Sequence, residues 1–549
     1  MHDVVIIGSG FGGAVAAARL GAAANRVLVL DKGIDPTGRF DPASDGPPVN
    51  EQGNRFAHSL SPTYLTEIGE LFTDTEGAYR DGVASMNVVT GKGLGGGSLL
   101  YDGVSLRAPQ LVFDQTRRGR RLWPSGFDRA ALDPWYRVVE DKLRVHKLEW
   151  TDATVPHWQL ATKRDFVFAE GCRRIGATAA PLKLADYQDA NEGWWNQGQR
   201  FSGRQDLTKN YLADALASGV EFRTGHDVDT IAPTNDGYVV KGVDTRGGRK
   251  VEFEIECRVL IVAAGCVASS ALLMRSRDHF VGERALDRGD EENGRAVLGQ
   301  NLSSNGDYGV TGRVGADFEM RVESFKGKPM SSFCPSFWPE HQFILIPFYA
   351  APLYTALEQI STLSPPKHPD ATGRGSTTVA ERDDGRRHRH WGFDFKRQLT
   401  EFGARSLTMG CLALDACEGE IGLSGDRVQV RWRETSARTE ERWSAAVDAM
   451  RRIYEALGGE LFLDNYRKDG TVNTSHPLGG CRMADEPTEG IVNANGESFT
   501  NRNLFVMDGA VIPSALGVNP SLTIAAVAER MADQLIRGDG TEALSDRLA

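Results

Sequence analysis

The chain has 549 residues, more than a single hydrophobic core usually organises, and two domains are therefore expected. Hydrophobic residues make up 40% and charged residues 25%, which is the ordinary composition of a soluble globular protein. The formal net charge of −11 argues against nucleic acid or an anionic membrane surface as the partner.

The cysteines and apolar runs indicate where the protein works. Seven cysteines, odd in number and without a C-x-x-C pair, are scattered along the chain: Cys172, Cys257, Cys266, Cys334, Cys411, Cys417 and Cys481. This pattern fits a reducing cytoplasm and offers no zinc or iron–sulfur spacing, so no metal is expected. No apolar run approaches the length that spans a bilayer, and the first predicted strand leaves no room for a signal peptide. We therefore expect a cytoplasmic protein without an integral membrane segment.

The first predicted element is a strand over His2–Ile7, an apolar run typical of strands buried on both faces of a parallel sheet. It ends at a G-x-G-x-x-G motif formed by Gly8, Gly10 and Gly13, after which a helix is predicted. Such glycines let the backbone approach a pyrophosphate, and the helix N-terminus supplies free N–H groups. The next predicted strand ends at Asp31. In dinucleotide sites, an acid at this position accepts hydrogen bonds from the hydroxyls of the adenosine ribose. The motif therefore indicates a dinucleotide site; the alternative is a turn that only packs a helix on a sheet.

A second glycine run, Gly91–Ser98, precedes Leu99–Gly103. Backbone that passes close to a flat ring or a pyrophosphate needs positions without side chains. A nicotinamide dehydrogenase has no obvious use for this run, which favours FAD. The alternative is a flexible linker, which the apolar residues on both sides argue against.

The C-terminal part carries two polar positions in tight turns. His476 lies in Ser475–Cys481, and Asn519 follows Gly517. Between them, Asn503–Gly509 is predicted to be a buried strand that ends in an acid and a glycine. A long helix is predicted from Asn519, and its N-terminus favours negative charge on a reduced flavin.

At this point the chain resembles the glucose–methanol–choline (GMC) family of flavin oxidoreductases, in its cholesterol oxidase-like branch. The stretches that carry the resemblance are spread over nearly the whole chain in the family's order: Val5–Gly13, Gly91–Gly103, His476–Cys481 and Asn503–Glu529. In combination they are specific, whereas each alone is not.

The resemblance implies an α/β fold: a Rossmann-type FAD-binding domain with an inserted α+β substrate domain, an antiparallel sheet backed by helices. The FAD-binding domain is expected to be discontinuous, over 1–110, 205–306 and 467–549. The substrate domain is expected over 111–204 and 307–466.

The resemblance also implies which residues hold FAD. They come from the two glycine runs, the strand around Val228 whose backbone meets the adenine, the strand that returns before Ala264, and the C-terminal segment. They are Gly8, Gly10, Phe11, Gly12, Gly13, Asp31, Lys32, Gly93, Gly96, Gly97, Ser98, Tyr101, Asp102, Val228, Ala264, Gly265, Asp508, Gly509, Asn519, Pro520 and Ser521.

Alcohol oxidation through a flavin needs hydride transfer to flavin N5 and removal of the hydroxyl proton. By the family match, His476 is the base that takes this proton, and Asn519 is its hydrogen-bond partner at the substrate oxygen. Without the family match, a lone histidine in a Gly/Pro-rich segment is more often an ordinary loop residue.

The chain departs from the family pattern in two places. Tyr101 stands where cholesterol oxidases carry asparagine, and Leu99–Asp102 contains no histidine for covalent attachment, so non-covalent FAD is expected. Cholesterol oxidases also use a glutamate of the substrate domain, for which Glu340 and Glu358 are candidates by position only. His388 and His390 lie in a basic run that is better explained as a solvated loop than as a metal site.

The expected substrate is a bulky apolar or sterol-like alcohol. Phe343–Tyr349 is either the wall of an apolar pocket or a core strand, and the nearby Phe333, Phe337 and Trp338 favour a hydrophobic ligand. The alternative is a sugar or small aromatic alcohol with a non-oxygen acceptor. Oxygen, a quinone or a redox protein are all open as electron acceptors.

Overall fold

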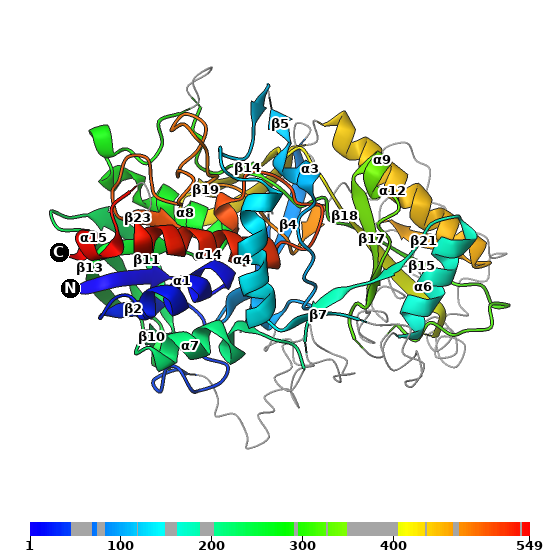
Figure 1. The fold of residues 1–549 in the computed structure, drawn as a ribbon, viewed down its shortest axis with the longest axis horizontal. Coiled ribbons are helices and arrows are strands. Elements are labelled where there is room, and N and C mark those ends of the chain that lie inside the picture. The colour runs from blue at the N-terminus through cyan, green and yellow to red at the C-terminus, as the bar shows by residue number, and fades with distance from the viewer. Residues whose placement is uncertain are drawn as a thin grey trace.

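The computed structural model describes most of the chain (Figure 1). The described residues are 1–45, 68–73, 83–117, 119–148, 162–186, 203–289, 295–324, 328–348, 404–433, 436–464, 472–538 and 541–549. No helix in this part of the chain is both long and apolar enough to cross a bilayer.

The largest sheet among the described residues has the strand order β10-β2-β1-β13-β12-β11, and β23 also pairs with β13. The strands are β1 His2–Ile7, β2 Val27–Leu30, β10 Glu221–Arg223, β11 His226–Pro233, β12 Tyr238–Asp244, β13 Val251–Val262 and β23 Leu504–Val506. The pairs of β1 with β2 and β13, of β10 with β2 and of β13 with β23 are parallel, whereas β11 and β12 form an antiparallel extension. The first strand is the predicted one, with all residues from Asp3 to Ile7 buried.

Helices pack on this parallel sheet because their apolar faces need cover. Helix α1 (Phe11–Gly21) follows β1 directly and packs against α14 (Ser521–Arg537) and α7 (Tyr211–Ala217). Arg19 of α1 donates to Asp533 of α14 at 2.6 Å, which joins two elements more than 500 residues apart. Helices from the two ends of the chain, α1 and α14, are therefore neighbours in space (Figure 1).

A second sheet has the order β14-β19-β20-β4-β22, with β3 also paired to β4. Its strands are β3 Gly69–Thr73, β4 Val83–Gly91, β14 Gln300–Leu302, β19 Gly419–Ser424, β20 Arg427–Arg433 and β22 Val472–Thr474. It draws strands from the predicted FAD-binding segments and from the predicted substrate segments. The domain boundaries given above therefore stay a prediction.

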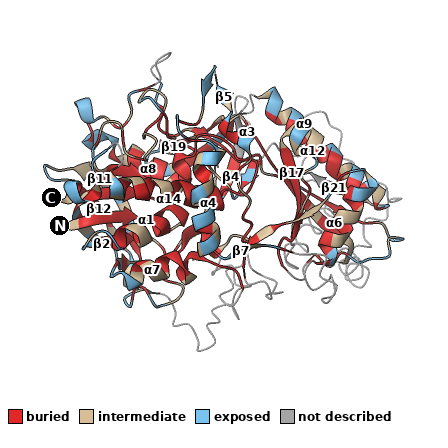
Figure 2. Cartoon of the chain, in the orientation of Figure 1, coloured by how far each residue is buried: buried red, intermediate tan, exposed pale blue. Residues whose placement is uncertain are grey.

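A third, antiparallel sheet has the order β17-β18-β15-β21. Its strands are β15 Tyr308–Arg313, β17 Phe343–Phe348, β18 Ser406–Ala413 and β21 Glu460–Asp464. Helix α12 (Ala437–Ala456) packs on this sheet beside α6 (Lys163–Arg174), at the opposite side of the molecule from α1 (Figure 1). Buried residues concentrate where helices meet sheets (Figure 2). The predicted antiparallel sheet backed by helices is thus confirmed, as is the α/β fold.

The remaining elements connect these layers. The helices are α3 Gln110–Phe113, α4 Arg129–Lys142, α8 Cys266–Ser276, α9 Trp338–His341 and α15 Leu544–Leu548. The short strands are β5 Thr116–Arg117, β6 Arg120–Arg121, β7 Val145–Lys147, β8 Ala180–Pro181, β9 Lys183–Ala185 and β16 Ser332–Phe333.

Candidate active site

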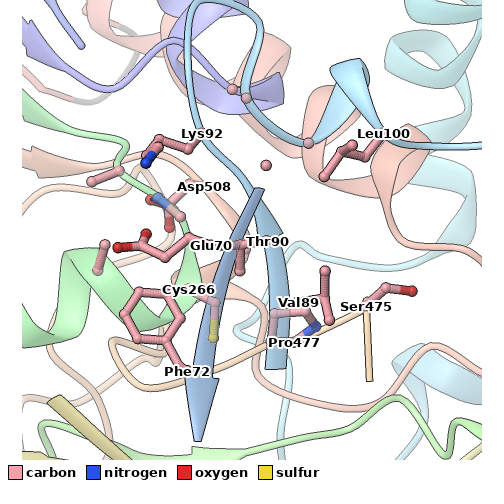
Figure 3. Close-up of a pocket in the computed structure, with 18 of the residues that line it drawn as sticks. Glu70, Phe72, Val89, Thr90, Lys92, Leu100, Cys266, Ser475, Pro477 and Asp508 are labelled. Atoms are coloured by element: carbon pink, nitrogen blue, oxygen red, sulfur yellow. Dashed lines mark hydrogen bonds between the residues drawn. The ribbon is translucent and has the colours of Figure 1, made fainter. Parts of the chain in front are cut away.

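A cavity of about 1200 Å³ lies where the carboxyl ends of β1 and β13 meet the second and third sheets. Its size suits a large cofactor together with a substrate. Strands β3 and β4 bring Glu70 and Thr90 to the same pocket as Cys266 and Asp508 (Figure 3). The carboxyl ends of parallel strands are the general location of ligands in such folds.

The glycines of this site fall into two groups. A side chain at Gly8, whose φ is +96°, or at Gly12 would overlap the backbone that directly follows β13 or β23. By contrast, nothing lies within 4 Å of the Cβ position at Gly10, Gly97 or Gly265, and all three line the cavity. The first group lets the chain pack tightly, and the second leaves open space along the cavity that a cofactor fits. The residues present therefore suit a dinucleotide.

The two glycine runs are tied together by Ser9. Its hydroxyl donates to Oδ2 of Asp31 at 2.5 Å and accepts a hydrogen bond from the Gly95 amide at 3.0 Å, 86 residues away. Asp31 also accepts from the Gly33 amide at 2.9 Å. Burial raises the pKa of Asp31, although these hydrogen bonds oppose the rise. A side chain at Gly96 would press on Gly10, so the two turns are in direct contact.

Most predicted cofactor residues line the cavity. They are Gly8, Gly10, Phe11, Gly12, Asp31, Lys32, Gly93, Gly96, Gly97, Tyr101, Asp102, Val228, Ala264, Gly265, Asp508, Gly509, Asn519, Pro520 and Ser521. Gly13 packs against the Gly8 carbonyl behind this wall. Ser98 is fully buried, and its hydroxyl donates to Gly95 O and accepts from the Leu207 amide, so it stabilises the glycine turn itself.

Asp508 joins the segments that frame the C-terminal side of the cavity. Its carboxylate accepts from the Gly265 amide at 2.8 Å, the Ser269 hydroxyl at 2.6 Å and the Ala510 amide at 2.7 Å. Burial raises its pKa against the effect of these bonds. The carboxylate thus orients the turn that carries Gly265 at the cavity wall.

The structure brings the two predicted catalytic residues together. Nδ2 of Asn519 lies 3.2 Å from Nε2 of His476, and both side chains line the cavity. The turn before His476 is closed by the Thr474 hydroxyl, which accepts from the His476 amide at 2.9 Å. Oδ1 of Asn519 is buried and has no hydrogen-bond partner within the described residues. The Asn519 side chain therefore contacts the imidazole through its nitrogen, while its oxygen is enclosed without a donor in this part of the chain.

The sequence analysis missed Asp307. Its carboxylate lies 2.8 Å from Nδ1 of His476 and also accepts from the hydroxyl of Thr474 at 2.7 Å. Burial lowers the pKa of His476, but the charge of Asp307 and its hydrogen bond outweigh burial and raise it. No motif in the sequence marks this residue, which stands just before β15, where the chain enters the third sheet.

The far part of the cavity is largely apolar. The strands and helix of the third sheet contribute Tyr308, Val310, Phe348 and Trp443, and Met330 adds to this wall. Within β17, residues Phe343–Ile346 are buried in the core, and only Phe348 reaches the cavity. The segment was predicted to be either the wall of an apolar pocket or a core strand. The core strand is correct for Phe343–Ile346, and within β17 Phe348 alone lines the pocket. Phe337 stacks on Phe343, away from the cavity wall.

Of the two candidate glutamates, only Glu340 lies within the described residues, and it does not enter the site. The Glu340 side chain is 82% exposed and lies beside His341, outside this cavity. Glu358, His388 and His390 lie outside the described residues. Within the described ranges, no group of three His, Cys, Asp or Glu side chains is arranged to hold a metal ion.

Comparisons with known proteins give one consistent family. Models of the GMC oxidoreductase family match residues 3–304 and 418–528. A long-chain-alcohol oxidase of Arabidopsis thaliana is 24% identical over 97% of this chain and 67% of its own length. A cholesterol oxidase of Mycobacterium tuberculosis is 25% identical over 97% of this chain and 90% of its own. The crystal structure of pyridoxine 4-oxidase from Mesorbium loti superposes with a TM-score of 0.63 at 18% identity, covering 97% of this chain and 99% of that one. This chain spans about two thirds of the plant long-chain-alcohol oxidases.

Proposed function

The chain belongs to the GMC oxidoreductase family of FAD-dependent enzymes that act on CH–OH groups, and we propose that it oxidises a bulky apolar alcohol to a ketone or aldehyde. The observation that carries the proposal is the pairing of His476 with Asn519 at a cavity that also holds both glycine turns. The proposed roles of the two side chains follow from their contacts.

His476 accepts the hydroxyl proton at Nε2. Asp307 accepts a hydrogen bond from the Nδ1–H of His476, which leaves Nε2 as the unprotonated ring atom, beside the Asn519 amide. The carboxylate also stabilises the imidazolium that forms, because opposite charges at this distance attract strongly in a buried site. Asp307 is therefore a positioning residue that makes His476 a stronger base.

Asn519 holds the substrate oxygen beside His476. Its side chain is fixed by the 3.2 Å contact with the imidazole, and its amide N–H donates a hydrogen bond to the substrate oxygen as negative charge develops there. When bound, FAD supplies the acceptor for the hydride that leaves the carbinol carbon. Leu99–Asp102 contains no histidine, which supports non-covalent FAD.

The apolar wall supports the substrate class. Aromatic and sulfur-containing side chains line this part of the cavity, from Tyr308, Met330, Phe348 and Trp443. They suit a hydrocarbon or sterol body rather than a pyranose. The relatives named for long-chain alcohols and cholesterol agree with this choice. Because those relatives are oxidases, molecular oxygen is the proposed electron acceptor.

The test is an anaerobic visible spectrum of the FAD-loaded protein. A long-chain 1-alkanol, a 3β-hydroxysteroid, a benzylic alcohol and a pyranose are added separately. We expect the flavin band to bleach with the alkanol or the steroid and to return when oxygen is admitted. If only the pyranose or only the benzylic alcohol bleaches the band, the substrate is a sugar or a small aromatic alcohol and not a bulky apolar one. A band that no alcohol bleaches would refute alcohol oxidation.

A further inference from the structure

Asn305 lies between β14 and β15, where the chain passes from the second sheet to the third. It is fully buried, and its φ of +58° places it in the left-handed region, which asparagine tolerates better than most residues. Its amide donates to the Ser303 hydroxyl at 2.8 Å, and its carbonyl accepts from the Ala413 amide at 3.1 Å. The backbone of Asn305 is therefore fixed in the connection between two sheets.

The Asn305 carboxamide makes three hydrogen bonds, all to the backbone that leads directly to Asn519. Its Oδ1 accepts from the Leu516 amide at 2.8 Å and from the Gly517 amide at 3.0 Å. Its Nδ2 donates to the Val518 carbonyl at 2.8 Å. Among the described residues, no other side chain bonds to this stretch of backbone. The path of the chain into Asn519 is therefore set by Asn305.

The same connection between β14 and β15 also bonds to the turn that carries His476. Asp307 accepts from Nδ1 of His476 at 2.8 Å, and the Ser304 carbonyl accepts from the Thr474 hydroxyl at 2.9 Å. One short piece of chain thus holds the two segments that bring Nδ2 of Asn519 within 3.2 Å of Nε2 of His476.

Asp415, which follows β18, anchors this connection. It is buried, and its carboxylate accepts from the hydroxyls of Ser303 and Ser304 at 2.9 Å. It also accepts from the amides of Ser304 at 2.8 Å and Gly306 at 3.1 Å. These bonds hold the backbone on both sides of Asn305 whether or not its side chain is present.

We propose that Asn305 is a positioning residue for the oxidation, which holds the backbone before Asn519 so that the Asn519 amide meets the substrate oxygen beside His476. This inference rests on the proposed function. A group that donates to an oxygen as charge develops there works only at the right distance, and a misplacement of about 1 Å can cost roughly 10²-fold in rate. Asn305 does not line the cavity, so its effect on the reaction passes through Asn519.

Asn305→Gly removes the three bonds without straining the backbone, because glycine adopts a φ of +58° freely. Asn301→Gly is the matched control. Asn301 is also buried with a positive φ, of +63°, but its side chain bonds to Arg117 and not to the backbone before Asn519. Asn305→Asp is a second variant, which keeps the acceptor for both amides and loses the donor to the Val518 carbonyl.

The decisive measurement is a double-mutant cycle of Asn305→Gly with Asn519→Ala, read as the anaerobic rate of flavin reduction by a saturating alcohol in the FAD-loaded enzyme. With Asn519 present, we expect Asn305→Gly to slow reduction by roughly 10- to 100-fold. In Asn519→Ala, the same change should alter the rate by less than about twofold, because the amide that Asn305 positions is gone. Asn301→Gly should stay within about twofold in both backgrounds. If Asn305→Gly slows both backgrounds by the same factor, Asn305 only stabilises the fold and the proposal is overturned.

If Asn305→Gly does not fold, Asn305→Asp takes its place in the cycle. It should slow reduction less than Asn519→Ala does, because two of the three bonds remain, and it should again have no effect once Asn519 is replaced. An equal loss in both backgrounds would contradict the proposal here too.

Hydrogen exchange tests the positioning without any alcohol. In FAD-loaded Asn305→Gly, peptides that contain Leu516 and Gly517 should exchange at least about tenfold faster than in the wild type, because both amides lose their acceptor. The same peptides in Asn301→Gly should exchange as in the wild type, and unchanged exchange in Asn305→Gly would overturn the proposal. If exchange behaves as expected but no alcohol reduces the wild-type flavin, alcohol oxidation is wrong and the positioning role falls with it.

Discussion

Nδ1 of His476 lies 2.8 Å from Oδ1 and 2.9 Å from Oδ2 of Asp307, a residue 169 positions earlier in the chain. A carboxylate accepts hydrogen bonds only, so Nδ1 carries the proton and Nε2 is directed to the cavity. The contact thus selects the tautomer in which the imidazole can receive a proton from a ligand. It also links the entrance to the third sheet with the C-terminal turn.

Replacing His476 by alanine is expected to slow flavin reduction by an alcohol by roughly 10²- to 10⁴-fold, because a positioned base contributes about that much. FAD binding is expected to persist, since the two glycine turns remain. Stopped-flow absorbance gives the rate, and the visible spectrum of the purified variant gives the FAD content. Unchanged reduction would remove His476 from the reaction.

The Asp307–His476 contact also makes a pH-dependent contribution to stability. The pKa of His476 in the folded protein is raised above its ordinary value of 6.5. The resulting stabilisation is therefore fully present below about pH 6.5 and is lost as the pH rises through the folded pKa. Asp307→Asn should lower the melting temperature most in mildly acidic buffer and least above that pKa. The double variant with His476→Gln is the control, in which this pH-dependent difference should vanish; a difference that is constant with pH would contradict the linkage.

Gly10 tests the cofactor site without disturbing the fold. No atom lies within 4 Å of its Cβ position, and its φ of −68° suits any residue. Gly10→Val should therefore fold but lose FAD affinity by at least about tenfold, because the new side chain occupies cavity space. Gly422→Val is the matched control, since Gly422 also has open space at Cβ but does not line the cavity. Titration of the apoproteins with FAD gives both affinities, and equal values would show that this space is not used.

Asp508 is expected to matter for stability as well as for the site. Asp508→Ala leaves the Gly265 amide, the Ser269 hydroxyl and the Ala510 amide without their acceptor. Donors left unsatisfied in a buried place cost energy, here roughly 2–4 kcal/mol in the free energy of unfolding. Denaturant unfolding of the apoprotein measures this loss. The free energy of unfolding of Asp508→Asn, which restores an acceptor for some of the donors, should lie between those of the wild type and Asp508→Ala. A loss below about 0.5 kcal/mol would be typical of a surface substitution and would contradict this role.

The parts of the fold that could be predicted are those with local patterns. The run from His2 to Ile7 is apolar throughout, and the glycine motif after it allows little besides a turn into a helix. The contact of His476 with Asn519 could be predicted only through the family resemblance, since spacing along the chain carries no information about it. Asp307 could not be predicted as the partner of His476. Its position depends on how the third sheet meets the C-terminal turn, and no periodicity of the sequence encodes that junction.

The distribution of the cavity wall along the chain has a consequence for biosynthesis. Gly10 lies in the first turn, Ala264 follows a strand from the middle of the chain, and Asn519 precedes the helix that packs against α1. A chain emerging from the ribosome folds its early segments first. Here the cavity wall that begins at Gly10 is complete only when the C-terminal segment has been added. FAD therefore meets a finished pocket only after Asn519 and α14 have been synthesised. Until then the first glycine turn lacks the segments that complete the wall of its pocket.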